Sequence, residues 1–221
     1  MDNKKIKNLS QTEIVVVLDR SGSMSSIGQA TVEGFNKFLD EQKNSEGEAF
    51  ITLVQFDDRY EMDYQSLPVK DATPLILGEN FIPRGSTALF DAVGKTIEEL
   101  NTDRDVVFVI ITDGEENSSK TYKREAIMKM IETQTEAGWK FLFLAANQDA
   151  IKAGGSIGIK GSNSINYSSN DNSTVNVFKN MSINMSKYRN AKFAAMDLGD
   201  VDLDQIAKDL DFDEKQREDS K

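Results

Sequence analysis

Three short runs of hydrophobic residues dominate the pattern along the chain, at residues 14–18, 106–111 and 141–146. Each run is continuous rather than alternating, and it consists mainly of β-branched, aromatic and other bulky apolar residues. Strands that are buried on both faces of a parallel sheet have this pattern. The three runs therefore predict the central strands of a parallel sheet.

Hydrophobic residues recur at helical spacing between these runs, over residues 26–41, 88–100 and 122–137. The last of these patterns stops at Gly138, a residue type that commonly ends helices. Residues 50–56 and 59–65 alternate more openly across Asp57 and Asp58, which predicts a β-hairpin at an edge of the sheet. Because strands alternate with helices, the chain is predicted to have an α/β fold.

The region after the third run is more polar. Residues 154–176 are rich in Ser, Asn and Gly, and we interpret them as a loop, although residues 165–167 are strand-like. Hydrophobic residues then recur at helical spacing from Val175 to Tyr188, and this pattern predicts a helix that packs on the sheet.

The last part of the chain is acidic. Residues 197–221 carry 10 acidic and 4 basic side chains with few hydrophobic ones, so we expect a frayed helix or a disordered tail. We therefore divide the chain into an N-terminal extension at 1–10, one domain at 11–195 and an acidic C-terminal tail at 196–221.

The amino-acid composition limits the kinds of metal site and catalytic mechanism that are possible. The 221 residues include no Cys and no His, which excludes zinc sites built on these residues as well as Ser-His-Asp and Cys-His catalysis. Any bound metal must be held by oxygen, which favours a hard cation such as Mg²⁺, Ca²⁺ or Mn²⁺. The net charge of −11 argues against nucleic acid or membrane as a partner, because both require a basic face.

The chain shows no sign of membrane targeting. No hydrophobic run approaches the ~20 residues that span a bilayer, and the N-terminal residues lack the hydrophobic region of a signal peptide. We therefore expect a cytoplasmic protein and take a monomer as the default state.

Oxygen-bearing side chains cluster at the ends of three predicted elements. Asp19, Ser21 and Ser23 directly follow the first strand, Thr87 precedes a helix, and Asp113 ends the second buried strand. Ligands of open α/β sheets bind at the carboxyl ends of the strands, so these side chains are expected in one layer. Turn formation or helix capping is the alternative role for such residues, but the coincidence of three segments favours a shared cation.

The segments DRSGSM, GSTALFDAV and ITDGEEN, in this order, resemble the three loops of the von Willebrand factor A domain. The resemblance covers residues 11–195 and implies a doubly wound, Rossmann-like fold, with a mostly parallel sheet, an antiparallel edge strand and helices on both faces. It also implies a metal-ion-dependent adhesion site, which in this family holds Mg²⁺ or sometimes Mn²⁺. The implied metal ligands are Asp19, Ser21, Ser23, Thr87 and Asp113.

The resemblance implies a protein-interaction domain, similar to the intracellular bacterial and phage members, in which the metal binds an Asp or Glu carboxylate of a partner protein. We therefore predict a non-catalytic function. The alternative is a Mg²⁺-dependent phosphoryl-transfer or hydrolytic enzyme that uses the same site, since a metal at the strand ends can activate water. Ser21 stands where many such phosphatases have a second Asp.

Two further groups of mostly acidic residues bear on this site. Glu115, Glu116 and Asn117 lie beside Asp113, and we interpret them as a solvated loop rather than as residues that tune partner charge. The acidic tail offers carboxylates that could reach the metal of the same or a neighbouring molecule.

Overall fold

The computed structural model describes residues 8–198 and 202–221. Its strands are β1 (Asn8–Asp19), β2 (Glu48–Phe56), β3 (Tyr60–Pro68), β4 (Arg104–Thr112), β5 (Lys140–Ala146) and β6 (Ser164–Tyr167). They form one sheet in the order β3-β2-β1-β4-β5-β6, in which only the β2–β3 pair at one edge is antiparallel. The predicted fold class is confirmed, including the edge hairpin.

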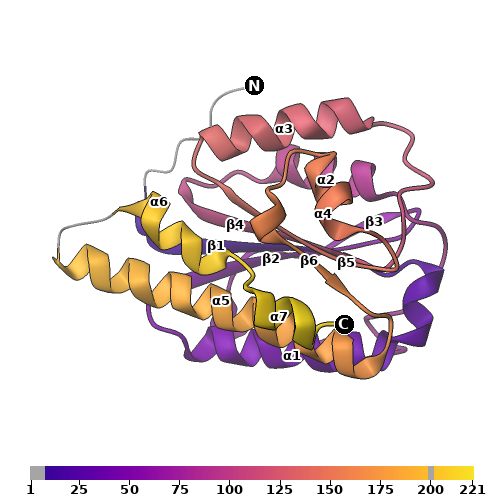
Figure 1. Cartoon of the computed structure of the whole chain (residues 1–221), viewed down its shortest axis with the longest axis horizontal. Helices are drawn as coiled ribbons and strands as arrows, with labels where there is room; N and C mark the ends of the chain where they lie inside the picture. Colours follow the sequence, from indigo (N-terminus) through magenta and orange to yellow (C-terminus); the bar gives the residue numbers. More distant parts are fainter. Residues whose placement is uncertain (1–7, 199–201) are drawn as a thin grey trace.

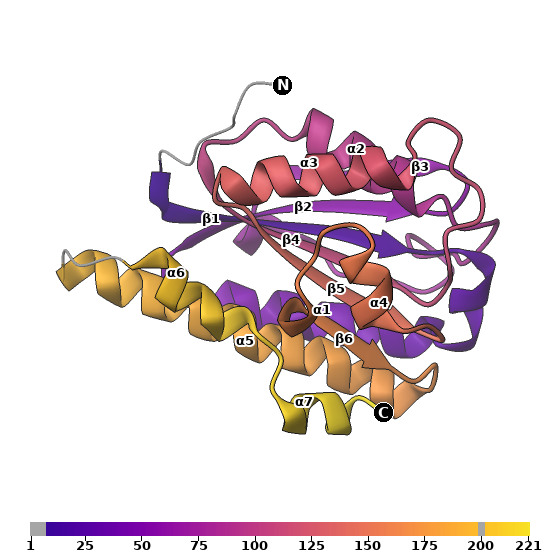
Figure 2. The same ribbon diagram turned by 45° about the horizontal axis from the view of Figure 1, so that its top comes forward.

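Helices cover both faces of this sheet (Figure 1). The helices are α1 (Gly28–Asn44), α2 (Leu89–Glu99), α3 (Arg124–Glu136), α4 (Ala150–Gly155), α5 (Asp171–Leu198), α6 (Leu203–Ile206) and α7 (Glu214–Asp219). Helices α2, α3 and α4 lie on one face, while α1 and α5 lie side by side on the other (Figures 1 and 2). Among the described residues, no helix combines the length and the apolar character that crossing a membrane requires.

The central strand β1 shows why its hydrophobic run is continuous. Ile14 and Val16 belong to the core under α1 and α5, whereas Val15 and Val17 belong to the core under α2 and α3. Successive side chains of a strand point to opposite faces, so a strand covered on both sides needs apolar residues at every position. On the α1 side, Gly34 lets the two helices approach closely, because a Cβ there would lie 2.6 Å from the ring of Phe178.

The loop interpretation of residues 154–176 is wrong in part. Residues 164–167 form the sixth strand, parallel to β5, and helix α5 already begins at Asp171. Ile165 and Tyr167 are buried in the core while Asn166 between them is exposed. Two inward side chains in a four-residue strand are too short a pattern to distinguish from a loop by sequence.

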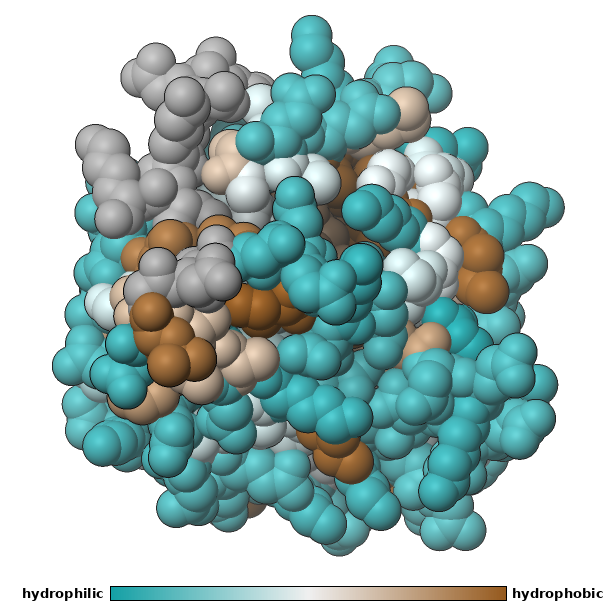
Figure 3. All heavy atoms as spheres, turned by 60° about the vertical axis from the view of Figure 1, so that its left-hand side comes forward, coloured by the Kyte–Doolittle hydropathy of each residue, from teal (hydrophilic) through white to brown (hydrophobic). Residues whose placement is uncertain are grey.

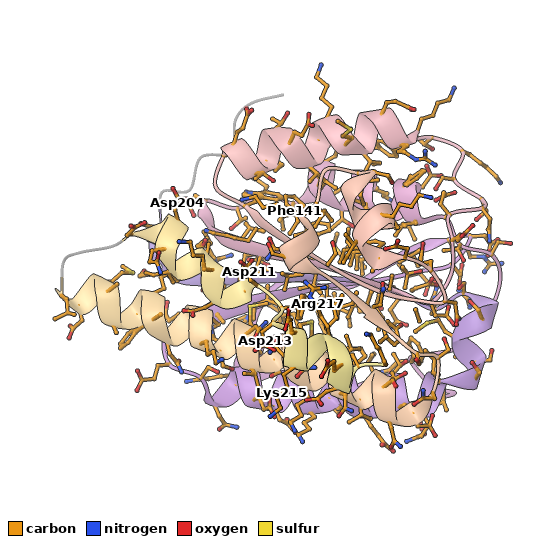
Figure 4. All side chains as sticks on the ribbon, viewed as in Figure 1. Phe141, Asp204, Asp211, Asp213, Lys215 and Arg217 are labelled. Atoms are coloured by element: carbon orange, nitrogen blue, oxygen red, sulfur yellow. The ribbon has the colours of Figure 1, made fainter. Side chains whose placement is uncertain are left out.

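The expectation of a frayed or disordered tail is wrong for residues 202–221. This C-terminal segment packs against α5 and β6, with Leu210 and Phe212 buried. The Arg217 guanidinium donates to two backbone carbonyls: that of Ser164 in β6, at 2.6 Å, and that of Gly161 in the segment before β6, at 2.9 Å. Figure 4 labels Arg217 on this segment, beside α5.

Side chains of α5 bind the backbone of the C-terminal segment. The Asn184 amide donates to the carbonyl of Asp211 at 3.0 Å, and the Asn180 amide donates to that of Gln216 at 3.1 Å. These polar contacts between distant residues leave no periodic signal in the sequence. The division of the chain at residues 10 and 195 stays a prediction, and residues 1–7 of the extension and 199–201 of the tail lie outside the described residues.

Candidate metal centre

The first ligand segment follows directly from the end of β1. Asp19 is the last residue of the strand and is fully buried. Its Oδ1 accepts from the backbone N–H of Ser21 at 2.6 Å, which turns the chain tightly at the carboxyl edge of the sheet. The turn is held to the Thr87 segment by the N–H of Gly22, which donates to the carbonyl of Gly85 at 3.1 Å.

Ser23 of this turn contacts Asp113, which directly follows the neighbouring strand β4. The Ser21 and Ser23 hydroxyl oxygens lie 3.1 Å apart, and the Ser23 hydroxyl donates to Asp113 Oδ1 at 2.5 Å. The other carboxylate oxygen, Asp113 Oδ2, is buried and has no hydrogen-bond partner. A buried carboxylate oxygen without a partner is energetically costly, and a bound cation would remove that cost.

Thr87 reaches the same place from a third segment. If Gly114 carried a Cβ, that atom would lie 3.1 Å from Thr87 Oγ1 and 3.5 Å from Ser23 Oγ. The Thr87 and Ser23 hydroxyls therefore both border the space left by the missing side chain of Gly114. The structure thus brings all five predicted residues to one edge of the sheet, and their role as metal ligands stays a prediction.

Burial controls the charge of the two acidic residues. Desolvation raises the pKa of Asp19 to about 6, although hydrogen bonds from Thr112 and Ser21 oppose the shift. Desolvation also raises the pKa of Asp113, against the hydrogen bond from Ser23. A nearby cation favours the ionised form, so both carboxylates would become more acidic with a metal bound.

The residues present fit a hard divalent cation. Two carboxylates and three hydroxyls are oxygen donors of the kind that Mg²⁺ and Mn²⁺ prefer. No group of three or more acidic side chains arranged to hold a metal occurs in residues 8–198 or 202–221. The candidate centre therefore depends on neutral hydroxyls for most of its protein donors.

The comparisons with known proteins identify the fold. No sequence-family model matches this chain, and the search of curated proteins finds no relative. Solved structures do match. Proximal thread matrix protein 1 from the mussel byssus is 16% identical, with a TM-score of 0.58 over 79% of this chain and 45% of that chain. A von Willebrand factor type A structure from Catenulispora acidiphila is 13% identical, with a TM-score of 0.56 over 81% of this chain and 43% of that one.

The chain has the von Willebrand factor A fold. The ArnB paralog VWA2 from Sulfolobus acidocaldarius is also similar, at 17% identity and a TM-score of 0.55 over 79% of this chain and 46% of that one. The matched region thus spans less than half the length of these structures. One structure of the mussel protein has zinc in its metal-ion-dependent adhesion site, and its TM-score to this chain is also 0.58.

The sequence did not reveal which residues support the candidate ligands in this von Willebrand factor A fold. The Thr112 hydroxyl donates to Asp19 Oδ2 at 2.6 Å, so both oxygens of Asp19 are oriented by the protein. Asn117 binds the backbone of Thr87 twice. Its Oδ1 accepts from the N–H of Thr87 at 2.9 Å, and its backbone N–H donates to the carbonyl of Thr87 at 3.0 Å.

The acidic loop after Asp113 is more than a solvated loop. Glu116 Oε2 accepts from the N–H of Phe90 at 2.9 Å, and its Oε1 accepts from the N–H groups of Ser118 and Ser119. Glu116 therefore ties this loop to the first turn of α2, and the solvated-loop interpretation is wrong for it. The sequence offered little indication of the bond between Asn117 and Thr87, because the two residues lie 30 positions apart. Only the position of Asn117, shortly after Asp113, placed it near the candidate centre.

Proposed function

We propose that this chain is a metal-dependent protein-interaction domain without catalytic activity. Asp19, Ser21, Ser23, Thr87 and Asp113 hold a divalent cation, and that cation binds a carboxylate of a partner protein. The bound metal supplies a Lewis-acidic centre for one further oxygen, and the protein supplies its position. The observation that carries the proposal is the buried, unpartnered Asp113 Oδ2 beside the Ser21 and Ser23 hydroxyls.

Mg²⁺ is the proposed native ion, with Mn²⁺ as a substitute. Hydroxyl and carboxylate oxygens are hard donors, and no sulfur or imidazole ligand exists in this sequence. The zinc in the adhesion site of the mussel protein supports the binding of a divalent metal at such a site. It leaves Mg²⁺ and Mn²⁺ to be tested directly.

We propose a partner carboxylate as the further ligand because only two of the five proposed protein donors carry negative charge. Three of the five proposed protein donors are neutral hydroxyls, so the cation keeps its affinity for one more anionic oxygen. Thr112 and Ser21 each donate a hydrogen bond to one oxygen of Asp19, and these bonds partly offset the negative charge of the carboxylate. An Asp or Glu side chain of a second protein fits this requirement.

Calorimetric titration of the metal-stripped chain with Mg²⁺ and Mn²⁺ tests the metal centre. We expect saturable binding that is lost in Asp19→Ala and kept in Asp40→Ala, which removes an exposed aspartate of α1. Binding that survives in Asp19→Ala would contradict the assignment.

Selection of peptides from a random library in the presence of Mg²⁺ tests the partner chemistry. The selected peptides should contain Asp or Glu, and replacement of that residue by Asn or Gln should abolish binding, as should EDTA. Peptides that bind in EDTA or bind Asp19→Ala would contradict the proposal. Mg²⁺-dependent hydrolysis of phosphatase or phosphodiesterase substrates that is lost in Asp19→Ala would contradict its non-catalytic part.

A further inference from the structure

Four charged side chains form a cluster beside the candidate metal centre, which we call the Asp57 cluster: Arg20, Asp57, Glu61 and Arg84. Arg20 Nε and Arg84 Nε both donate to Asp57 Oδ2, at 3.0 and 2.9 Å. The same two guanidinium groups donate to Glu61, at 2.8 and 2.6 Å. Asp57 is fully buried and Arg20 is 4% exposed, so the two share a buried ion pair.

Asp57 also holds the backbone of the neighbouring segments. Its carbonyl accepts from the N–H of Ala88 at 3.0 Å, and its Oδ1 accepts from the N–H of Arg59 at 2.7 Å. Ala88 directly follows the candidate ligand Thr87, and Arg20 directly follows the candidate ligand Asp19. One residue of the β2–β3 turn therefore contacts the immediate neighbours of two ligands that lie on different loops.

The two ligand loops have few other direct connections. Within the part of the chain that the structure describes, they are joined by the N–H of Arg84, which donates to the carbonyl of Arg20 at 2.8 Å, and by the Gly22–Gly85 hydrogen bond described above. Both bonds lie close to the Asp57 cluster. The planar guanidinium groups fix direction as well as distance, because their N–H groups have a rigid arrangement.

A buried ion pair is a costly way to stabilise a hairpin. Desolvation of the charges offsets much of their attraction, and well-packed apolar residues often stabilise a fold equally well. A cluster of this kind can instead hold two loops in one geometry, and Mg²⁺ requires such precision because it accepts only near-octahedral arrangements of its ligands. Functional sites must be held to within about 0.5 Å by such supporting contacts.

We propose that Asp57 is a positioning residue of the metal centre. Its side chain, through Arg20 and Arg84, fixes the loop that carries Asp19, Ser21 and Ser23 relative to the segment of Thr87. Its backbone carbonyl holds Ala88 in addition. This inference rests on the proposed function, since it assumes that these residues bind the metal. The competing explanation is that the Asp57 cluster contributes only to the stability of the fold.

Calorimetric titration of the full chain with Mg²⁺ separates the two explanations. Asp57→Asn should weaken Mg²⁺ binding by about 10- to 100-fold, the usual effect of removing a residue that orients metal ligands. Glu13→Gln is the matched control, because Glu13 is also buried in an ion pair, with Arg104 at 2.9 Å, and it lies in the middle of β1, away from the candidate centre. It should lower the melting temperature and leave Mg²⁺ affinity unchanged.

A second variant covers the case in which Asp57→Asn does not fold. Arg84→Gln removes a side chain that is 37% exposed, so we expect it to fold and to weaken Mg²⁺ binding in the same direction by a smaller factor. Wild-type affinity in Arg84→Gln and in folded Asp57→Asn, with binding lost in Asp19→Ala, would overturn this inference and leave the proposed function intact. A wild-type chain that binds neither Mg²⁺ nor Mn²⁺ would overturn both.

Discussion

At the scale of single residues, the candidate centre combines two buried carboxylates with hydroxyls that are oriented from several directions. Thr112 and Ser21 hold the two oxygens of Asp19, and Asn117 holds the backbone of Thr87. Asp113 keeps one oxygen without a partner. The protein therefore holds the candidate donors in place, and a cation bound there would require little rearrangement of them.

The raised pKa of Asp19 predicts that metal binding depends on pH. A protonated carboxyl is a poor metal ligand, and the pKa of Asp19 lies at about 6. Lowering the pH from 7.5 to 5.5 should therefore weaken Mg²⁺ binding by about fourfold, the ratio of the ionised fractions of one such group. Calorimetry at the two pH values measures this ratio.

The raised pKa of Asp19 also affects the stability of the metal-free chain, which should fall as the pH rises, whereas Mg²⁺ affinity should increase. Because the folded state binds this proton more tightly than the unfolded state, the metal-free chain loses stability as the pH rises through 6. Mg²⁺ compensates for this loss, so the increase in Tm on adding Mg²⁺ should be larger at pH 7.5 than at pH 5.5. An equal increase at both values would contradict the role of Asp19 as a titrating ligand.

The lack of a side chain at Gly114 leaves room for the Thr87 hydroxyl in the candidate centre, so a larger residue there should weaken Mg²⁺ binding. Gly114→Ala places a methyl group 3.1 Å from Thr87 Oγ1 and should displace this hydroxyl, which weakens Mg²⁺ binding by about tenfold. Gly155→Ala in α4 is the control, because nothing lies within 4 Å of its added Cβ. Equal calorimetric affinities for the two variants would show that the space beside Gly114 is not part of the centre.

At the scale of elements, the C-terminal segment behaves as part of the fold. Phe212→Ala removes a side chain that is 4% exposed, so the free energy of unfolding should fall by about 3–5 kcal/mol. Urea denaturation measures this change. Leu198→Ala removes a side chain that is 83% exposed and should change the value by no more than about 0.5 kcal/mol. A loss below about 1 kcal/mol for Phe212→Ala would show that the segment is attached only loosely.

The elements also explain what the sequence can predict. Residues 14–18, 106–111 and 141–146 are buried on both faces, so their continuous hydrophobic runs identify β1, β4 and β5. The candidate ligand residues lie within a few positions of strand or helix ends, so short local motifs were sufficient to predict that they gather at one edge of the sheet. These parts of the fold are encoded locally.

The missed features depend on contacts between residues far apart in the sequence. Arg20 and Asp57 are separated by 37 positions, and Asn184 lies 27 positions from Asp211. An isolated charged or amide residue looks the same in a sequence whether it is solvated or paired. Such contacts become visible only when the topology places the two residues together.

At the scale of the whole molecule, the surface is acidic. The net charge is −11, and the face in Figure 3 is predominantly hydrophilic, with small separate hydrophobic areas. Where the partner is also acidic around the carboxylate that it offers, the two surfaces carry charge of the same sign. The two molecules would then repel each other until the carboxylate comes close to the metal.

This repulsion predicts an unusual dependence on salt. Raising the ionic strength from about 0.05 to 0.5 M screens charges that are not in contact, so the association rate of an acidic partner should increase at constant Mg²⁺. Stopped-flow measurements with a selected acidic peptide test this, and a neutral peptide that contains a single Glu is the control. A rate that falls with salt for the acidic peptide would contradict this long-range repulsion.

The C-terminal segment has a further consequence for self-association. β6 is an edge strand, and an exposed edge can recruit a strand from another molecule and so begin aggregation. Arg217 occupies the carbonyl of Ser164 in β6, and Ser168, directly after this strand, donates its N–H to the carbonyl of Ser220. A chain shortened before this segment would thus lose the cover on its last strand along with the buried Leu210 and Phe212. We therefore expect the loss of residues 202–221 to promote aggregation as well as to lower stability.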